Sequence, residues 1–511
     1  MRATGLDRND TLVVPAVVGA AALGGVLLAA FSMGAKWTIL IALGYFALAG
    51  LLVARNKRIL SLCLLSACVP IGFQYNFWTH ANKFSFIDHF GGALAEPVLN
   101  MVDVPILLLL VLWLTDLRTK ARSVPAWTHT DTLVAAMLGI SLFSLFNTEE
   151  YLLFVFEMAR YLKYLLLYWM LRTYLDSPPA FWGILTAQIS VLAIQALVSL
   201  MQFFLYFQFP IPVGGVSGAD VEVVDNEIIQ RVTGIMGHSN TFSAYLSVAC
   251  AFCLIVLFSR VKPLFRYTTL PFLLSGLIAL VLTFSRNGWM VFAFNAAVIG
   301  AWAFRTRRLS AATLAGVLVP CGGLFAVLVV TGVFDTMLTR VFHTQGKAFD
   351  SRWDLMAVAW EMIRAHPLVG IGLNSFEESM IRFDPRHITH VIRQPVHNGF
   401  LLVAAESGLP ALALLLALLV RHLSMAMRIL RGQDELHFAV GLAGLATFGG
   451  LGLANLFDVT LRKESVGGLI VVVAAMLASL SRIDEGQTAD RESGTPAAFS
   501  AGRSNGYVTR L

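Results

Sequence analysis

Long apolar runs alternate with short polar stretches along almost the whole chain. A helix of about 20 apolar residues is long enough to cross a bilayer. By this measure the sequence holds fourteen candidate spans, at roughly residues 12–31, 36–54, 59–75, 103–117, 131–147, 151–171, 180–208, 238–259, 268–285, 289–304, 311–332, 398–420, 437–457 and 466–481. The fourth and the last are short, so the pattern predicts 12–14 transmembrane helices.

The composition agrees with this pattern. Hydrophobic residues make up 57% of the 511 positions, charged residues only 13%, and the mean hydropathy is +0.73. Soluble domains carry roughly 25% charged residues, so we expect an all-α polytopic membrane protein. All five cysteines lie in apolar runs, and Cys250 and Cys253 are interpreted as small packing residues rather than a redox or metal pair. The first apolar run lacks a cleavage site of small residues and is predicted to be a retained span.

Basic clusters set the expected orientation, because cytoplasmic loops keep the excess of Lys and Arg. Such clusters occur at residues 55–58, 118–122, 260–266, 305–308 and 421–431. All five fall on one side if fourteen spans are real and the N-terminus is cytoplasmic, so both termini are predicted to be cytoplasmic. The Ser-, Gly- and Thr-rich segment 482–511 is expected to be a disordered tail.

The largest connection, residues 333–397, is then predicted to be periplasmic and partly helical. Its sequence SRWDLMAVAWEMIRAHP has a helical period that places Trp353, Met356, Ala357, Trp360 and Ile363 on one face. Against the usual charge rule it carries seven basic residues, namely Arg340, Lys347, Arg352, Arg364, Arg382, Arg386 and Arg393. They either pair with the acidic residues of the same loop or gather an anionic ligand such as a phosphate.

Charged residues at the edges and inside the apolar runs are further candidates. Arg286 stands in TFSRNGWM between two spans, and Arg231 precedes the GHSN turn. Each either extends to lipid headgroups or binds an anion. In the sixth span we expect Glu157 to pair with Arg160 inside the helix bundle.

His397 opens the span that follows the large loop. A lone histidine at a helix start can be a structural hydrogen-bonding group, or it can abstract a proton from a hydroxyl at the membrane surface. It has no second His or Cys at metal-ligand spacing, and we predict no metal site and no cofactor.

Four stretches together resemble the O-antigen ligase/polymerase superfamily of bacterial membrane glycosyltransferases. They are RVTGIMGHSNTFSAYL (231–246), TFSRNGWM (283–290), SRWDLMAVAWEMIRAHPLVGIGLNSF (351–376) and PVHNGFLLVAAESGLP (396–410). The resemblance implies a GT-C-like, helical, metal-independent enzyme of the inner (plasma) membrane with a periplasmic active site. Such an enzyme transfers a saccharide from an undecaprenyl-diphosphate-linked donor to an acceptor hydroxyl.

The resemblance also implies roles for particular residues. By its motifs His397 is the expected base, and Arg286 and Arg352 are expected to bind the diphosphate of the donor. Arg231 is a further candidate for donor binding. Secondary contacts to sugar or phosphate are expected from Arg382, Arg386, Arg393, His387 and His390.

The expected organisation has four parts. Residues 1–230 form N-terminal transmembrane helices, and 231–420 form the ligase-like core with its loop 333–397. Residues 421–481 add C-terminal helices before the tail 482–511. Expected partners are the lipid-linked glycan donor, a saccharide or lipid A-core acceptor and membrane lipids, with no nucleic acid.

The acceptor stays open at this point. A growing polysaccharide, lipid A-core and a protein hydroxyl would make the enzyme a polymerase, a ligase or an O-linked oligosaccharyltransferase. Fourteen spans are two beyond the twelve common among the ligases, which favours the polymerase. A solute transporter is the alternative from another class, but inverted repeats with broken helices would be expected of it and the sequence shows no clear internal repeat.

Overall fold

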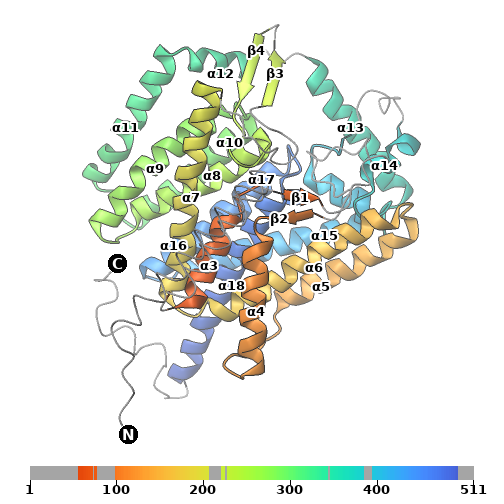
Figure 1. Cartoon of the computed structure of the whole chain (residues 1–511), viewed down its shortest axis with the longest axis horizontal. Coiled ribbons are helices and arrows are strands. Elements are labelled where there is room, and N and C mark those ends of the chain that lie inside the picture. The colour runs from red at the N-terminus through yellow and green to blue at the C-terminus, as the bar shows by residue number, and fades with distance from the viewer. Residues whose placement is uncertain are drawn as a thin grey trace, which may run out of the picture.

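The structure is a computed structural model that describes residues 54, 56–72, 74–76, 98–206, 220–224, 227–342, 346–384 and 394–492. Figure 1 shows a body of packed helices with α11 at one edge and α13 and α14 at the opposite edge. Two small antiparallel ribbons, β1(Gln74–Asn76) with β2(Val98–Asn100) and β3(Asp220–Val224) with β4(Glu227–Arg231), are added to it. The protein is an all-α polytopic membrane protein, as predicted.

The helices follow the apolar runs closely. They are α3(Lys57–Cys68), α4(Asp103–Arg118), α5(His129–Phe143), α6(Tyr151–Tyr174), α7(Pro178–Leu205), α8(Ser239–Phe258), α9(Pro263–Leu282), α10(Arg286–Arg305), α11(Ala311–Val330), α12(Val333–Phe342), α13(Gly346–Ala365), α14(Phe376–Ser379), α15(Gly399–Ile429), α16(Glu435–Gly444), α17(Leu451–Ala454) and α18(Glu464–Glu492). A π-helical turn, Leu445–Gly450, joins α16 to α17.

Every candidate span from the third onward therefore contains a helix, and the first two lie outside the described residues. Within the described ranges, eight helices are long and apolar enough to cross a membrane. The helix of the third span ends at Cys68, well before residue 75. The predicted Glu157–Arg160 pair forms inside α6, with 2.5 Å between Oε1 of Glu157 and Nη2 of Arg160.

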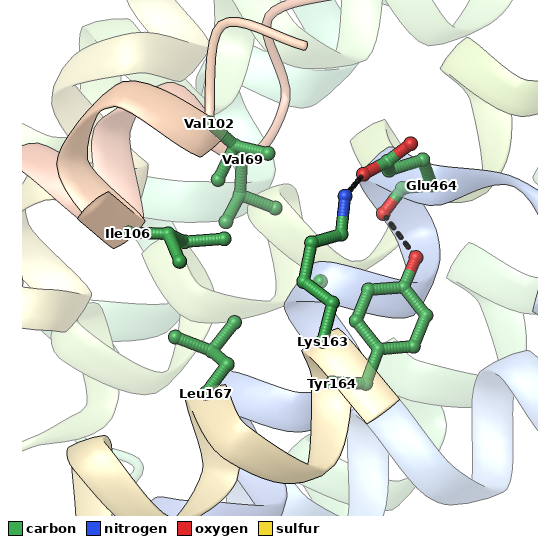
Figure 2. Close-up of a pocket in the computed structure, with 8 residues that line it drawn as sticks. Val69, Val102, Ile106, Lys163, Tyr164, Leu167 and Glu464 are labelled. Carbon is green, nitrogen blue, oxygen red and sulfur yellow. Dashed lines mark hydrogen bonds and ion pairs between the residues drawn. The ribbon is translucent and has the colours of Figure 1, made fainter. Parts of the chain in front are cut away.

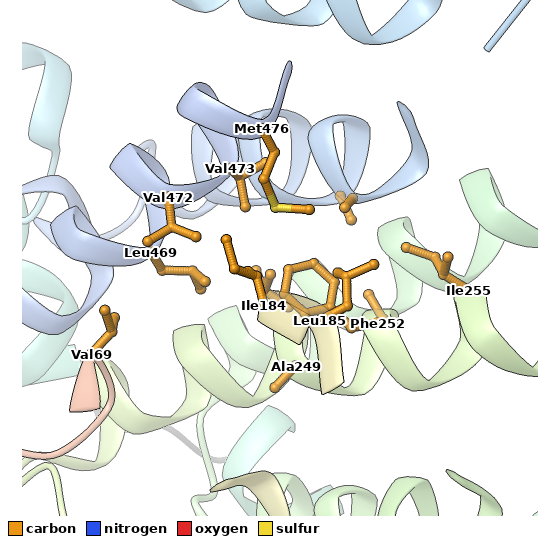
Figure 3. Packing of buried hydrophobic residues seen from close by; sticks show 14 of the residues in the cluster. Val69, Ile184, Leu185, Ala249, Phe252, Ile255, Leu469, Val472, Val473 and Met476 are labelled. Atoms are coloured by element: carbon orange, nitrogen blue, oxygen red, sulfur yellow. The ribbon is translucent and has the colours of Figure 1, made fainter. Parts of the chain in front are cut away.

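Helix α8 is the centre of the core, and its whole apolar window is buried. In Figure 3 its residues Ala249, Phe252 and Ile255 face Ile184 and Leu185 of α7, with α18 on the other side. Apolar burial gives little net gain between helices in lipid, so close van der Waals packing has to hold them together. Gly276 of α9 allows such close packing, because a Cβ there would lie 2.7 Å from Sγ of Cys250. Cys250 is fully buried, so its predicted packing role is confirmed.

Helix α15 is broken near its start, and this break shapes the functional end of the molecule. Gly408 has φ 86° and ψ 169°, and Pro410 follows it. The break frees backbone groups that the segment before α14 takes up: Ile371 N–H donates to the carbonyl of Ala405 (2.9 Å), and Leu409 N–H donates to the carbonyl of Pro367 (2.8 Å). Irregular backbone at membrane depth is tolerated only where such partners exist.

Two expectations differ from the structure in detail. The packed face of α13 consists of Leu355, Val358, Ala359 and Met362, whereas Trp353 and Trp360 of the predicted apolar face are about half exposed. Helix α18 continues to Glu492, past the predicted boundary at 481. The first part of the predicted tail is thus helical, and residues 493–511 lie outside the described residues.

Candidate functional site

His397 lies where the large connection meets α15. The next residue, Asn398, caps the helix, and its side-chain oxygen accepts from the N–H groups of Phe400 (3.0 Å) and Leu401 (2.9 Å). Gly399 N–H donates to the carbonyls of Asn455 (2.8 Å) and Asp458 (3.2 Å). The start of α15 is therefore fixed against the segment that follows α17. This end of the molecule is called the His397 end below.

That segment places a carboxylate beside the imidazole. Nδ1 of His397 is buried and lies 3.7 Å from Oδ1 of Asp458, an ion-pair distance that is too long for a hydrogen bond. The His397 side chain is 25% exposed as a whole, although its Nδ1 is buried. A carboxylate on the Nδ1 side favours the tautomer that leaves Nε2 free to accept a proton.

The pKa of Asp458 shows that this carboxylate stays ionised. Burial alone would raise its pKa, but the interaction with His397 and the positive fields of His238 and Lys463 outweigh burial and hold the pKa well below its usual range. His238 belongs to the GHSN turn, so that turn also lies close to Asp458. The sequence analysis did not single out Asp458, which sits in the short polar stretch DVTLRKE after an apolar run.

Arg286 is at the same end, in the first turn of α10. Ser285 caps this helix, and Phe284 before it has φ 48°, a strained conformation for a bulky residue. Nδ2 of Asn287 donates to the carbonyl of Ala454 (3.1 Å), immediately before the segment that holds His397 and Asp458. The Arg286 side chain is exposed, and the next residue links it to the His397 end.

Arg231 lies next to this turn and is mostly engaged within the protein. It is 8% exposed, its Nε donates to the carbonyl of Thr283 (2.9 Å), and its Nη2 donates to Oδ1 of Asn240 (2.6 Å). It thus fixes the turn before Arg286 against the start of α8. This geometry indicates that Arg231 positions Arg286 rather than contacting a donor itself.

Arg352 is carried by α13, whose packed face meets the segments next to His397 and Asp458. Leu355 and Val358 belong to one buried cluster with Val396 and Val459. Arg352 itself is partly exposed. The structure therefore brings the three main candidates, His397, Arg286 and Arg352, to one end of the molecule from three different elements.

Of the five residues expected to make secondary contacts to sugar or phosphate, the structure describes only Arg382. Arg382 forms an ion pair with Glu149, so it is engaged at the junction with α6. Arg386, His387, His390 and Arg393 lie outside the described residues.

A buried charged cluster that sequence reasoning missed lies next to Asp458. Nη1 of Arg462 donates to Oε1 of Glu406 (3.0 Å), and its Nη2 donates to Oδ1 of Asn374. Nη1 of Arg160 in turn donates to the carbonyl of Arg462 (2.8 Å). Burial would lower the pKa of Arg462, but the carboxylates of Glu406, Glu157 and Glu377 raise it. A signal existed, because Glu406 interrupts the apolar run LLVAAESGLP, and a charge within a span is a functional candidate.

A second polar cluster nearby has a structural role. Lys163 of α6 bridges Glu464 and Asp103, at 3.0 Å from the latter, beside a small cavity lined by Val69, Val102 and Ile106. Figure 2 shows its ammonium group directed at Glu464 and the Tyr164 hydroxyl directed at the Glu464 backbone carbonyl. With both charges satisfied, these contacts fasten α6 to the start of α18.

Comparison with known protein families found one match. Residues 270–416 match the family model described as O-antigen ligase. This part of the chain is similar to the O-antigen ligase family. The matched range includes Arg286, Arg352 and His397 and ends before Asp458 and Arg462. No curated protein matches the chain. The match supports a membrane enzyme of glycan assembly and confirms the resemblance seen in the sequence.

Proposed function

We propose that the protein transfers a saccharide from an undecaprenyl-diphosphate-linked donor to an acceptor hydroxyl at the periplasmic face of the inner membrane. The observation that carries the proposal is the convergence of His397, Asp458 and the Arg286 turn on one segment, residues 454–458. A hydroxyl needs a base, and a diphosphate leaving group needs fixed positive charge. This end supplies both.

In the proposed reaction, Nε2 of His397 takes the proton of the acceptor hydroxyl as its oxygen bonds to the anomeric carbon. The bond from that carbon to the diphosphate oxygen breaks, and its electron pair leaves with the lipid diphosphate. Direct attack of this kind inverts the anomeric centre. Asp458, at ion-pair distance from Nδ1, favours the tautomer that carries its proton on Nδ1.

Arg286 and Arg352 are proposed to bind the diphosphate. Guanidinium groups grip phosphate oxygens bidentately and neutralise the charge that develops on the leaving group. They lie on different helices, so together they can fix the orientation of the donor as well as its charge. In this proposal the reaction needs no metal ion.

A polysaccharide polymerase is favoured slightly over a lipid A-core ligase, because of the predicted span count. The test uses purified protein in nanodiscs, undecaprenyl-diphosphate-linked glycan, and either free glycan or lipid A-core as acceptor. His397→Ala, Arg286→Ala and Arg352→Ala should each lose at least about 100-fold in transfer. Arg305→Ala, at the far end of α10 and exposed, is the matched control and should transfer normally.

Normal transfer by all three variants would overturn the site assignment. Movement of a solute across a sealed bilayer without any glycan transfer would favour a transporter instead.

A further inference from the structure

Helix α13 exposes two tryptophans among charged side chains. Its packed face, Leu355, Val358, Ala359 and Met362, is fully buried. On the opposite face Trp353 is 55% and Trp360 50% exposed. Indole rings with polar neighbours are characteristic of the membrane–water boundary.

The charged neighbours of these indoles fit the same boundary. The Arg364 guanidinium lies 5.4 Å from the centre of the Trp360 ring and 3.0 Å from Oε1 of Glu361. With Arg352 and Asp354 also on this helix, α13 is too polar to cross a bilayer, and among the described helices it is not one that could span. Because the apolar side of α13 packs against protein, the tryptophans of its exposed side are the residues that can reach the lipid headgroups.

The chain beyond α13 connects this face to the lipid-facing surface of the spans. Nδ2 of Asn147, at the end of the spanning α5 segment, donates to the carbonyl of Gly370 (2.7 Å). At this junction Leu368 is 69%, Leu409 46% and Phe146 84% exposed. Exposed apolar side chains therefore lie on both sides of this contact, at residue 146 of the α5 segment and at residues 368 and 409.

We propose that α13 lies on the membrane surface at the His397 end, with Trp353 and Trp360 inserted among the lipid headgroups. The partner is the lipid bilayer itself. Arg352 stands next to Trp353 in the sequence, so this anchoring holds its guanidinium at the depth of the headgroup phosphates. That last consequence rests on the proposed function, because it matters for a diphosphate carried by a lipid.

The direct test is tryptophan quenching in nanodiscs and needs no transfer activity. Trp353→Phe and Trp360→Phe keep an aromatic ring, and the fluorescence each removes is the contribution of that one residue. This contribution should be quenched strongly by lipids brominated near the headgroup and weakly by aqueous acrylamide. Trp113→Phe is the control, because Trp113 is 7% exposed and donates to Thr173 (3.0 Å).

Quenching of Trp353 and Trp360 by acrylamide but not by brominated lipid would overturn the proposal in favour of a water-facing helix. Protection from both quenchers would also overturn it, because the face would then be covered by protein, such as a second copy of the chain.

A kinetic arm tests the consequence for the donor. The double variant Trp353→Asp, Trp360→Asp should raise KM for the lipid-linked donor several-fold with kcat preserved, while the double Phe variant should keep the wild-type KM. An unchanged KM in the Asp variant would contradict the link between anchoring and donor binding. The quenching result stands or falls independently of whether the protein is a transferase.

Discussion

Two buried arginine–carboxylate pairs lie at opposite ends of the molecule and are built differently. Arg172 pairs with Asp131 at 2.9 Å, and the same carboxylate accepts from Trp169 (2.8 Å). The side-chain partners of Arg172 are close in sequence: Asp131 of α5 is 41 residues away, and the carbonyl of Ala126, to which Nη2 also donates (2.8 Å), is 46 residues away. This pair fastens two helix ends that are close in sequence.

The Arg462 pair joins distant parts of the chain. Its partners Glu406 and Asn374 are 56 and 88 residues away, and Arg160, which donates to its carbonyl, is 302 residues away. It therefore ties together the break in α15, the segment before α14, helix α6 and the loop that carries Asp458. Removing one partner of such a buried pair costs about 3–5 kcal/mol. The difference suggests that the first pair mainly stabilises, whereas the second sets the geometry of the site.

The largest expected contrast concerns the two aspartates. Asp458→Asn should reduce transfer about 10- to 100-fold in folded protein, because the imidazole loses the carboxylate that orients it. Asp131→Asn should lower the melting temperature and leave the rate per folded molecule near wild type. Size-exclusion profiles, thermal melts and initial rates separate the two effects. Equal losses of transfer rate in both variants would show that the two aspartates do not differ in role.

A smaller contrast is expected between the arginines. Arg462→Lys keeps the charge but loses the forked contact to Glu406 and Asn374, so transfer should fall by roughly tenfold. Arg172→Lys loses a similar fork and should affect stability alone. The measurement is kcat and KM for the donor, with folded protein quantified in each case. A wild-type kcat in Arg462→Lys would show that this pair is structural like the other.

The pH dependence of transfer tests the charge state of Asp458. The pKa of Asp458 is held below its usual range of about 4, so the carboxylate stays ionised and its protonation should cause no fall in kcat/KM above that pH. The measurement is kcat/KM against pH for the wild type and for Asp458→Asn. An additional fall near pH 4 in the wild type that is absent from Asp458→Asn would contradict this expectation.

The smallest change tests the break in α15. A Cβ at Gly408 would lie 2.3 Å from the carbonyl oxygen of Leu368, and its φ of 86° is unfavourable for alanine. Gly408→Ala should lower stability by about 1–3 kcal/mol and loosen the junction with residues 367–372. Gly300→Ala is the control, since a Cβ there meets nothing within 4 Å. Equal melting temperatures for Gly408→Ala and the wild type would show that the junction tolerates the added Cβ.

The sequence predicted the helices for a simple physical reason, whereas the roles of the candidate site residues stay a prediction. Apolar runs report local structure, and a resemblance in short motifs located His397, Arg286 and Arg352. Span parity placed Arg286 and His397 at one end, and the structure also brings them to one end. What sequence reasoning missed depends on long-range contacts: neither Asp458 nor Arg462 has a pattern that names a partner 56 or more residues away. The exposed side of α13 was also missed, because periodicity finds an apolar face without saying whether protein or lipid covers it.

The central claim is that His397 is the base of a glycan transfer reaction. It is tested most directly by single-turnover transfer from the lipid-linked donor, comparing His397→Gln with His129→Gln, an exposed histidine at the far end of α5. His397→Gln should lose about 100- to 10,000-fold in transfer with donor binding retained, and His129→Gln should transfer at the wild-type rate. Transfer by His397→Gln at the wild-type rate would contradict it.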